Sequence, residues 1–159
     1  MLPEALFGRK KAVPGNFRGS ETEPQPGLRA NLKKSPYLKL HLSNAPGRNT
    51  VTAYGTGFVE VNGERHLSSL VILPTHLEPH WTLGPDNEIS ADAIRFLASC
   101  EAEIVLIGTG SEQRFPHPAA LRPLIEAGIG FEVMSTPAAC RTYNILVAED
   151  RLVAAGLVV

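Results

Sequence analysis

Residues 103–110, with the sequence EIVLIGTG, constrain the fold more than any other stretch of this chain. Four large apolar residues in a row, 104–107, end abruptly in Gly-Thr-Gly. A short unbroken apolar run of this kind is typical of a strand that is buried on both faces. In open α/β sheets, ligands bind beside the carboxyl ends of such strands. We therefore predict a central buried strand whose following loop lies at the ligand-binding edge of a sheet.

The residues before this strand predict an antiparallel half. A strand-like pattern starts near Pro36, and residues 51–64 contain a second strand pattern. Asn62-Gly63 is a strong hairpin signal, so we expect a partner strand over residues 65–73. Residues 74–85 include three prolines and are expected to form a loop.

Two helices are predicted on either side of the following strand at 131–134. Pro118 suits the first turn of a helix that ends at Gly128, with a buried stripe made of Leu121, Leu124 and Ile125. Pro123 lies inside this helix and predicts a bend or a late start. After the strand, Thr136 is expected to cap a helix whose first helical position is Pro137.

A further helix is predicted before the central strand, and a further strand closes the chain. Ser90 can cap a helix over residues 91–100, and residues 152–158 are the closing strand. Strands that alternate with helices through short links imply right-handed parallel crossovers. The predicted fold class is therefore α/β with a mixed sheet. Its strands are antiparallel in the first half and follow a β-α-β-α-β order in the second.

The charge distribution separates a basic tail from the rest of the chain. Residues 1–34 carry seven Lys or Arg against three Glu, whereas the remainder carries eight basic residues against thirteen acidic ones. The tail is rich in proline and lacks hydrophobic periodicity, so we expect residues 1–35 to be disordered and residues 36–159 to form one globular domain. The tail could contact RNA, anionic lipid or an acidic protein. Nucleic-acid binding is not expected, because its cations are scattered.

The cysteines and the hydropathy pattern favour a reducing compartment. The two cysteines, Cys100 and Cys140, form no CxxC pair, which is typical of free thiols. No apolar run approaches the roughly 20 residues that a membrane span needs. We expect a cytoplasmic protein without a membrane span, or a mitochondrial one if the source is a eukaryote.

Gly108, Thr109 and Gly110 form the candidate ligand loop. Glycines let the backbone turn tightly, so the loop's N–H groups could face an anion. The Lys-Ser/Thr pair of a phosphate loop is absent, and Gln113 stands where a dinucleotide fingerprint has glycine. Simple turn glycines are the alternative interpretation.

Cys140 is a candidate nucleophile, and Arg141 and Asn144 are candidate ligand-binding residues. Near the first turn of a helix, the dipole would lower the pKa of the Cys140 thiol. No histidine lies nearby in the sequence, and cysteine is often a small buried side chain. Arg141 and Asn144 could bind an anion near the Gly108 loop. They could instead tie the helix to a backbone carbonyl or to Glu149.

Trp81 lies between two prolines in the loop predicted over residues 74–85. It is interpreted either as a plug over the sheet or as an anchor for a partner protein. His76 and His80 are four residues apart, but Pro79 separates them and no metal motif accompanies them. We expect no metal site and no cofactor.

Several motifs together resemble the domain of unknown function 498 family, which is built on an Mth-type domain. The resemblance covers about residues 37–159 and lies in Tyr54-Gly-Thr-Gly-Phe58, Trp81, Ile107-Gly-Thr-Gly110, Glu132-Val-Met-Ser-Thr136, Ala139-Cys-Arg-Thr-Tyr-Asn144 and Glu149-Asp-Arg151. It implies a three-layer β plus α/β fold with one mixed sheet. The family includes bacterial and archaeal single-domain proteins and mitochondrial complex I assembly factor 3. It implies no established activity, cofactor or catalytic residue.

Two functions are therefore expected as rivals. The first is a non-enzymatic module that binds another protein, such as a component of a respiratory or membrane complex during assembly. The second is a small-molecule or anion site, or an enzyme, formed by the 108–110 loop with Arg141, Asn144 and possibly Cys140. The two are distinguished by whether polar groups from the 108–115 loop and the 136–144 helix share one pocket.

Overall fold

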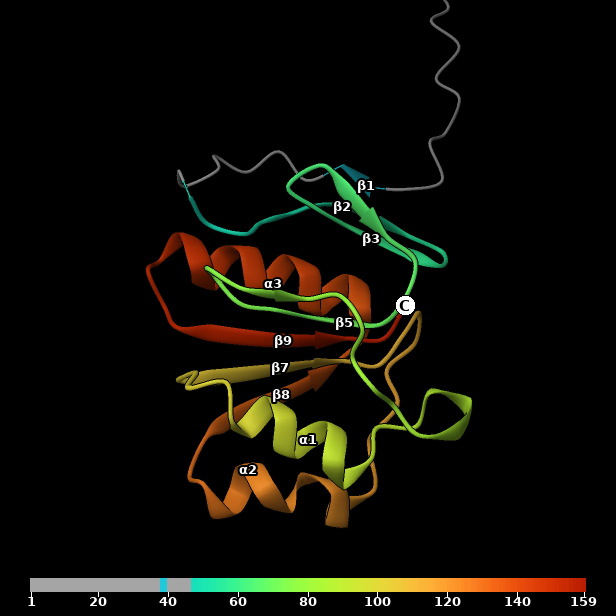
Figure 1. Ribbon diagram of the computed structural model, residues 1–159, viewed down its shortest axis with the longest axis vertical. Helices are drawn as coiled ribbons and strands as arrows, with labels where there is room; N and C mark the ends of the chain where they lie inside the picture. The colour runs from blue at the N-terminus through green and yellow to red at the C-terminus, as the bar shows by residue number, and fades with distance from the viewer. Residues whose placement is uncertain (1–37, 40–46) are drawn as a thin grey trace, which may run out of the picture. The chain divides into compact units, whose positions relative to one another are not determined.

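The computed structural model describes residues 38–39 and 47–159. The predicted tail and most of the strand pattern that starts near Pro36 lie outside the described residues. The described part contains a four-stranded antiparallel sheet, a five-stranded mixed sheet and three α-helices (Figure 1). The predicted α/β fold with one mixed sheet is confirmed.

The antiparallel sheet has the strand order β1-β2-β3-β4. Asn62 and Gly63 join β3 to β4 with φ values of 51° and 87°. Two successive positive φ values are what a two-residue type I′ hairpin requires, so the predicted hairpin is confirmed. The bounds are β1 (Leu38–Lys39), β2 (Val51–Gly55), β3 (Phe58–Val61) and β4 (Glu64–His66).

The predicted partner strand over residues 65–73 is wrong, because this stretch contributes to both sheets. Its beginning belongs to β4, and its end forms β5 (Leu70–Ile72) in the mixed sheet. The two parts differ in burial: Leu67 between them is 73% exposed, whereas all three residues of β5 are buried. The hairpin signal fixes where a partner strand begins but not which sheet its continuation joins.

The mixed sheet has the strand order β6-β5-β9-β7-β8. Strands β9, β7 and β8 are parallel, and β5 runs antiparallel to β9 and to β6. The predicted buried strand is β7, whose neighbour β9 is the middle strand and is buried along its whole length. The bounds are β6 (Leu77–Glu78), β7 (Ile104–Gly108), β8 (Gly130–Met134) and β9 (Val153–Leu157).

Helices α1 (Ala91–Ala98) and α2 (Arg122–Glu126) cover one face of the mixed sheet. The predicted cap of α1 is confirmed, since the Ser90 hydroxyl accepts a hydrogen bond from the Ala93 N–H at 3.3 Å. Pro123 gives a late start: the 3-10 helix η2 (Pro118–Leu121) precedes α2. The predicted burial of Ile125 is wrong, because its side chain is 60% exposed.

Helix α3 (Thr136–Ala148) lies between the two sheets (Figure 1). Its buried side chains pack against β2 and β3 on one side and against β7 and β9 on the other. The antiparallel sheet therefore adds a layer outside α3. This arrangement brings the β2–β3 turn close to the carboxyl ends of the parallel strands, where the candidate site lies.

Candidate functional site

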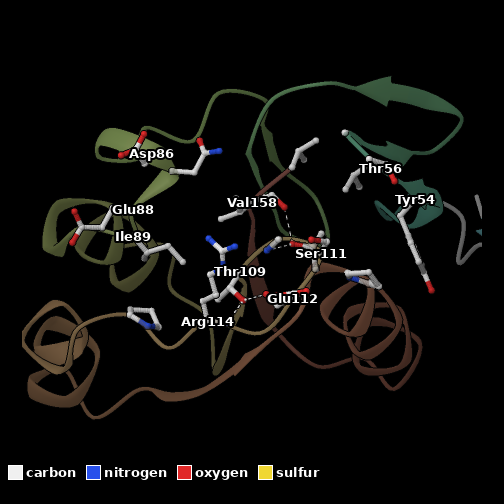
Figure 2. A pocket seen from close by; sticks show the side chains of 18 of the residues that line it. Tyr54, Thr56, Asp86, Glu88, Ile89, Thr109, Ser111, Glu112, Arg114 and Val158 are labelled. Atoms are coloured by element: carbon white, nitrogen blue, oxygen red, sulfur yellow. Dashed lines mark hydrogen bonds between the residues drawn. The ribbon is translucent and has the colours of Figure 1, made fainter.

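A cleft opens at the carboxyl ends of the parallel strands. Thr109 follows β7, Val158 follows β9, and Thr136 begins α3 soon after β8, and all three line the cleft. Its volume is about 940 Å³. This edge is the usual place for ligands in open α/β sheets. The remaining walls come from the β2–β3 turn, the 3-10 turn η1 (Pro85–Asn87) and the loop after β7 (Figure 2). The lining residues are 54–59, 86–89, 109–112, 114–117, 136–137 and 158–159.

The Thr109 hydroxyl fixes the loop that forms the cleft floor. Its oxygen lies 2.9 Å from the Glu112 carbonyl oxygen and 3.2 Å from that of Met134, and it accepts a hydrogen bond from the Arg114 N–H at 2.9 Å. The Thr109 N–H donates to the same Met134 carbonyl at 2.9 Å. The loop is therefore held in one shape by a buried side chain that bonds across it.

Thr136 and Gly110 bind each other reciprocally. The Gly110 N–H donates to the Thr136 hydroxyl at 2.9 Å, and the Thr136 N–H donates to the Gly110 carbonyl at 2.7 Å. The same hydroxyl donates to the Val158 carbonyl at 2.7 Å. The prediction that Thr136 caps α3 is wrong: Ser135 occupies the N-cap position, and the Thr136 hydroxyl bonds to neighbouring segments instead of to its own helix.

Gly108 is required by close packing of the strand end against α3. A β-carbon at this position would lie 3.0 Å from the Thr136 Cα, from its Oγ1 and from a Leu157 methyl carbon. Neighbours at that distance would have to move, and the first of them is backbone. The glycine therefore lets the start of α3 approach β7.

The candidate ligand loop thus has a structural explanation. The N–H groups of Thr109 and Gly110 are both satisfied inside the protein, by Met134 and by Thr136. A phosphate cradle needs N–H groups that point at the ligand and lack other partners. Gly108 and Gly110 serve packing and turn geometry, since Gly110 has a φ of 102°.

Arg114 and Phe115 both line the cleft. Figure 2 shows the Arg114 side chain extending into the cleft between Ile89 and Val158. No described residue forms a side-chain hydrogen bond or ion pair with its guanidinium. Phe115 also lines the cleft and is 76% exposed. The cleft therefore combines a planar cation that no described residue pairs with and an accessible aromatic ring.

The rim of the cleft is acidic and its shape is tightly specified. Asp86, Glu88 and Glu112 are all exposed lining residues. Asp86 and Asn87 have φ values of 54° and 59°, in the left-handed region that Asp and Asn tolerate better than most residues. The turn is closed by a hydrogen bond from the Gly84 N–H to the Glu88 carbonyl at 2.8 Å.

Cys140 belongs to α3, does not line the cleft, and is buried in the core. Its side chain is fully buried among residues of α3 and both sheets. Burial raises the pKa of the Cys140 thiol from 9.0 to about 12, and the charge of Arg141 and a backbone hydrogen bond only partly oppose this. The prediction that the helix dipole lowers this pKa is wrong, because desolvation disfavours the thiolate more strongly.

Asn144 and Arg141 tie α3 to β2. The Asn144 side chain accepts from the Val51 N–H at 2.9 Å and donates to the Val51 carbonyl at 2.7 Å. Arg141 donates to the Tyr54 hydroxyl at 2.6 Å, with its guanidinium carbon 6.0 Å from the centre of the Tyr54 ring. Of the two roles weighed for Asn144, the backbone link is the one found. Arg141 and Asn144 do not line the cleft, although Arg141 contacts Tyr54, which does.

Trp81 is a buried plug over the mixed sheet. Its side chain is 5% exposed, and its indole N–H donates to the Ala93 carbonyl at 3.3 Å. A β-carbon on Gly156 would lie 2.8 Å from the ring, so the glycine in β9 makes room for it. A buried ring that seals α1 against β9 is not available as an anchor for a partner protein.

Sequence reasoning missed the side chains that now characterise the cleft. Arg114 and Phe115 carry no motif, and their only signal is that they follow the turn at the end of a buried strand. Tyr54 and Thr56 belong to the Tyr-Gly-Thr-Gly-Phe motif, but the spacing gives no sign that this turn reaches β7. The contact depends on α3 separating the two sheets.

Two other observations concern the described residues as a whole. No group of three or more His, Cys, Asp or Glu side chains among them is arranged to hold a metal ion. None of the helices in the described part is long and apolar enough to cross a membrane.

Comparison with known proteins identifies relatives of the whole domain. The chain is 30% identical over 116 residues to NADH dehydrogenase [ubiquinone] 1 alpha subcomplex assembly factor 3 of Danio rerio; the match covers 72% of this chain and 66% of the relative. A crystal structure from Bordetella parapertussis is 40% identical, with a TM-score of 0.66, and covers 72% of this chain and 98% of that one. A Bordetella pertussis structure described as a Mth938-like domain is 34% identical, with a TM-score of 0.63, and covers 76% and 92%.

The model of one protein family matches residues 51–158. This range includes α3, the mixed sheet and every residue that lines the cleft except Val159. The resemblance inferred from the motifs is confirmed: the chain belongs to the protein family of unknown function DUF498/DUF598.

Proposed function

We propose that this protein is a non-enzymatic module that binds another protein through the cleft during assembly of a respiratory complex. The names of its relatives support this role, since the Danio rerio protein is called an assembly factor for NADH dehydrogenase. This chain spans 66% of that relative's length. The partner proposed here is a component of NADH dehydrogenase or a second protein that acts in its assembly.

The observation that carries the proposal is the pairing of Arg114 with Phe115 at an open cleft. Arginine and large aromatic side chains dominate the binding energy of protein interfaces. Here the guanidinium has no described partner and the ring is 76% exposed. A partner segment with a carboxylate beside an apolar side chain would satisfy both.

The arrangement of the polar groups supports binding rather than catalysis. The Thr109 and Thr136 hydroxyls bond to the protein's own backbone and hold the cleft in shape. The Cys140 thiol is buried away from the cleft and its raised pKa keeps it protonated at neutral pH. The His117 Nδ1 accepts a hydrogen bond from the Ala119 N–H at 3.2 Å, at the start of η2.

Affinity capture with cleft variants tests the proposal. The tagged full chain is expressed in its own host, and captured proteins are quantified by mass spectrometry. We expect components or assembly factors of NADH dehydrogenase with the wild type, and at least a tenfold loss with Phe115→Ser or Arg114→Gln. Leu67→Ser is the matched control, because Leu67 is 73% exposed and does not line the cleft.

Two outcomes contradict the proposal. In the first, the wild type captures no such protein reproducibly, or Phe115→Ser captures as much of it as the control Leu67→Ser does. In the second, inorganic phosphate or succinate raises the melting temperature of the wild type but not of Arg114→Gln, which would favour a small-molecule site in the cleft.

A further inference from the structure

Strand β8 forms one edge of the mixed sheet. It pairs with β7 over five residues, Gly130–Met134, and no other described strand pairs with its outer side (Figure 1). The opposite edge, β6, has two residues. A free edge offers backbone N–H and C=O groups that can pair with another extended chain.

The hydrogen bonds of β8 show which residues face outward. The Met134 carbonyl accepts from the Thr109 N–H on the β7 side. Backbone groups of successive strand residues point to alternate sides, so Phe131 and Val133 present theirs to the outer edge. The Gln113 side chain donates to the outward Val133 carbonyl at 2.9 Å. Among residues 47–159, no partner is found for the remaining outward groups, which are the Phe131 N–H and C=O and the Val133 N–H.

The two faces of this edge differ in chemistry. Phe131 and Val133 are partly buried and pack against the apolar cluster under α1 and α2. Glu132 points to the other face and is exposed. A chain added beside β8 would therefore place apolar side chains next to Phe131 and Val133, and one side chain opposite the Glu132 carboxylate.

We propose that β8 binds an extended segment of another protein by strand addition, and that this segment carries Lys or Arg opposite Glu132 between apolar residues. The backbone supplies the affinity, and the alternating side chains supply the register. No residue of β8 lines the cleft, so this surface is separate from the one that Arg114 and Phe115 form. The proposal does not depend on the function assigned to the cleft.

Charge argues against a second copy of this chain as the occupant. Two copies related by a two-fold axis would pair their β8 strands antiparallel. The register that uses both Phe131 and Val133 places Glu132 opposite Glu132. Such non-hydrogen-bonded neighbours approach to about 4.5 Å between Cα atoms, and like charges directly opposite are destabilising. A partner with a cation at that position removes the conflict.

A charge-swap experiment with two synthetic peptides tests the proposal. The peptides are acetyl-Thr-Val-Lys-Val-Thr-amide and the same sequence with Glu in place of Lys, and binding to the full chain is followed by NMR chemical shifts. We expect the wild type to bind the Lys peptide about fivefold more tightly than the Glu peptide, with the largest shifts at the amides of Phe131 and Val133. In Glu132→Lys the preference reverses.

Glu126→Lys is the matched control, because Glu126 is an exposed acid of the neighbouring helix α2. It should leave the preference for the Lys peptide unchanged. The proposal is overturned if Glu126→Lys reverses the preference as strongly as Glu132→Lys, or if neither peptide shifts the Phe131 and Val133 amides. It is also overturned if sedimentation shows a wild-type dimer that Val133→Pro converts to a folded monomer, because the edge would then bind a second copy.

Discussion

At the scale of single residues, burial has a larger effect on the pKa of Cys140 than the position of this residue in its helix. It lies near the start of α3, where the helix dipole favours a thiolate. Its side chain is nevertheless fully enclosed by the core between the sheets, and the pKa rises to about 12. A thiolate here would lose its hydration, and the Arg141 charge and a backbone hydrogen bond compensate for only part of that loss. The residue therefore acts as a small apolar side chain.

This burial predicts a loss of stability at alkaline pH. The folded thiol keeps its proton between its ordinary pKa of 9.0 and about 12, whereas the unfolded thiol loses it. The stabilisation that this thiol provides is complete below pH 9 and is lost progressively between pH 9 and about pH 12. From pH 8 to pH 10, urea titrations should show the wild type losing about 1.4 kcal/mol more unfolding free energy than Cys140→Ala. Equal losses in the two proteins would contradict the assignment.

At the scale of elements, α3 joins the two sheets through a polar link inside an apolar core. Asn144 is 2% exposed and forms two hydrogen bonds with the backbone of Val51, at the start of β2. A buried amide that pairs with both the N–H and the C=O of one residue fixes the position of that strand relative to the helix. Tyr54 is held near Arg141 by the same helix, so this link also shapes one wall of the cleft.

Replacing Asn144 should therefore be costly. Asn144→Leu keeps the branched shape and the number of heavy atoms of the side chain but leaves the Val51 N–H and C=O buried without the Asn144 amide as their partner. We expect the free energy of unfolding to fall by about 3 kcal/mol in urea titrations. Ile145→Ala, at a 53% exposed position of the same helix, should change it by less than about 0.5 kcal/mol. An equal loss of unfolding free energy in the two variants would contradict a stabilising role for the hydrogen bonds between Asn144 and Val51.

Some of these elements could be predicted from the sequence alone, and others could not. Local signals were sufficient for β7, for the Asn62-Gly63 hairpin and for the Ser90 cap, because each depends on neighbouring residues. They failed where a distant segment decides. Trp81 is buried because Gly156 leaves room for it, and nothing near Trp81 in the sequence reveals that contact.

The candidate site was only partly accessible to the same reasoning. The carboxyl end of β7 was expected to border a site, and a cleft lies there. The loop's N–H groups, however, are used by Thr136 and Met134, which are distant in sequence. Arg114 and Phe115 could not be predicted as cleft residues, because the cleft exists only where the β2–β3 turn and η1 lie across from them.

At the scale of the whole molecule, the two surfaces proposed for binding lie on one domain, and no residue of β8 lines the cleft. Within the described part of the chain, the Arg114 guanidinium at the cleft has no partner beside the exposed Phe115 ring, and the outer edge of β8 beside Glu132 pairs with no other strand. Inside the core, the Thr136 and Asn144 side chains bond to backbone groups of Val158 and Val51. The proposed role in assembly rests on these two surfaces and on the name of the Danio rerio relative, which is called an assembly factor for NADH dehydrogenase.

The most direct test of this account measures assembled NADH dehydrogenase in cells from which the gene for this chain has been deleted. The wild-type chain, Phe115→Ser, Leu67→Ser or Cys140→Ala is returned, and the complex is quantified on native gels. We expect deletion to lower the amount of complex, and the wild type, Leu67→Ser and Cys140→Ala to restore it. Phe115→Ser, although equally abundant, should fail to restore it. Restoration by Phe115→Ser together with failure of Cys140→Ala would contradict a protein-binding cleft and favour a reactive thiol.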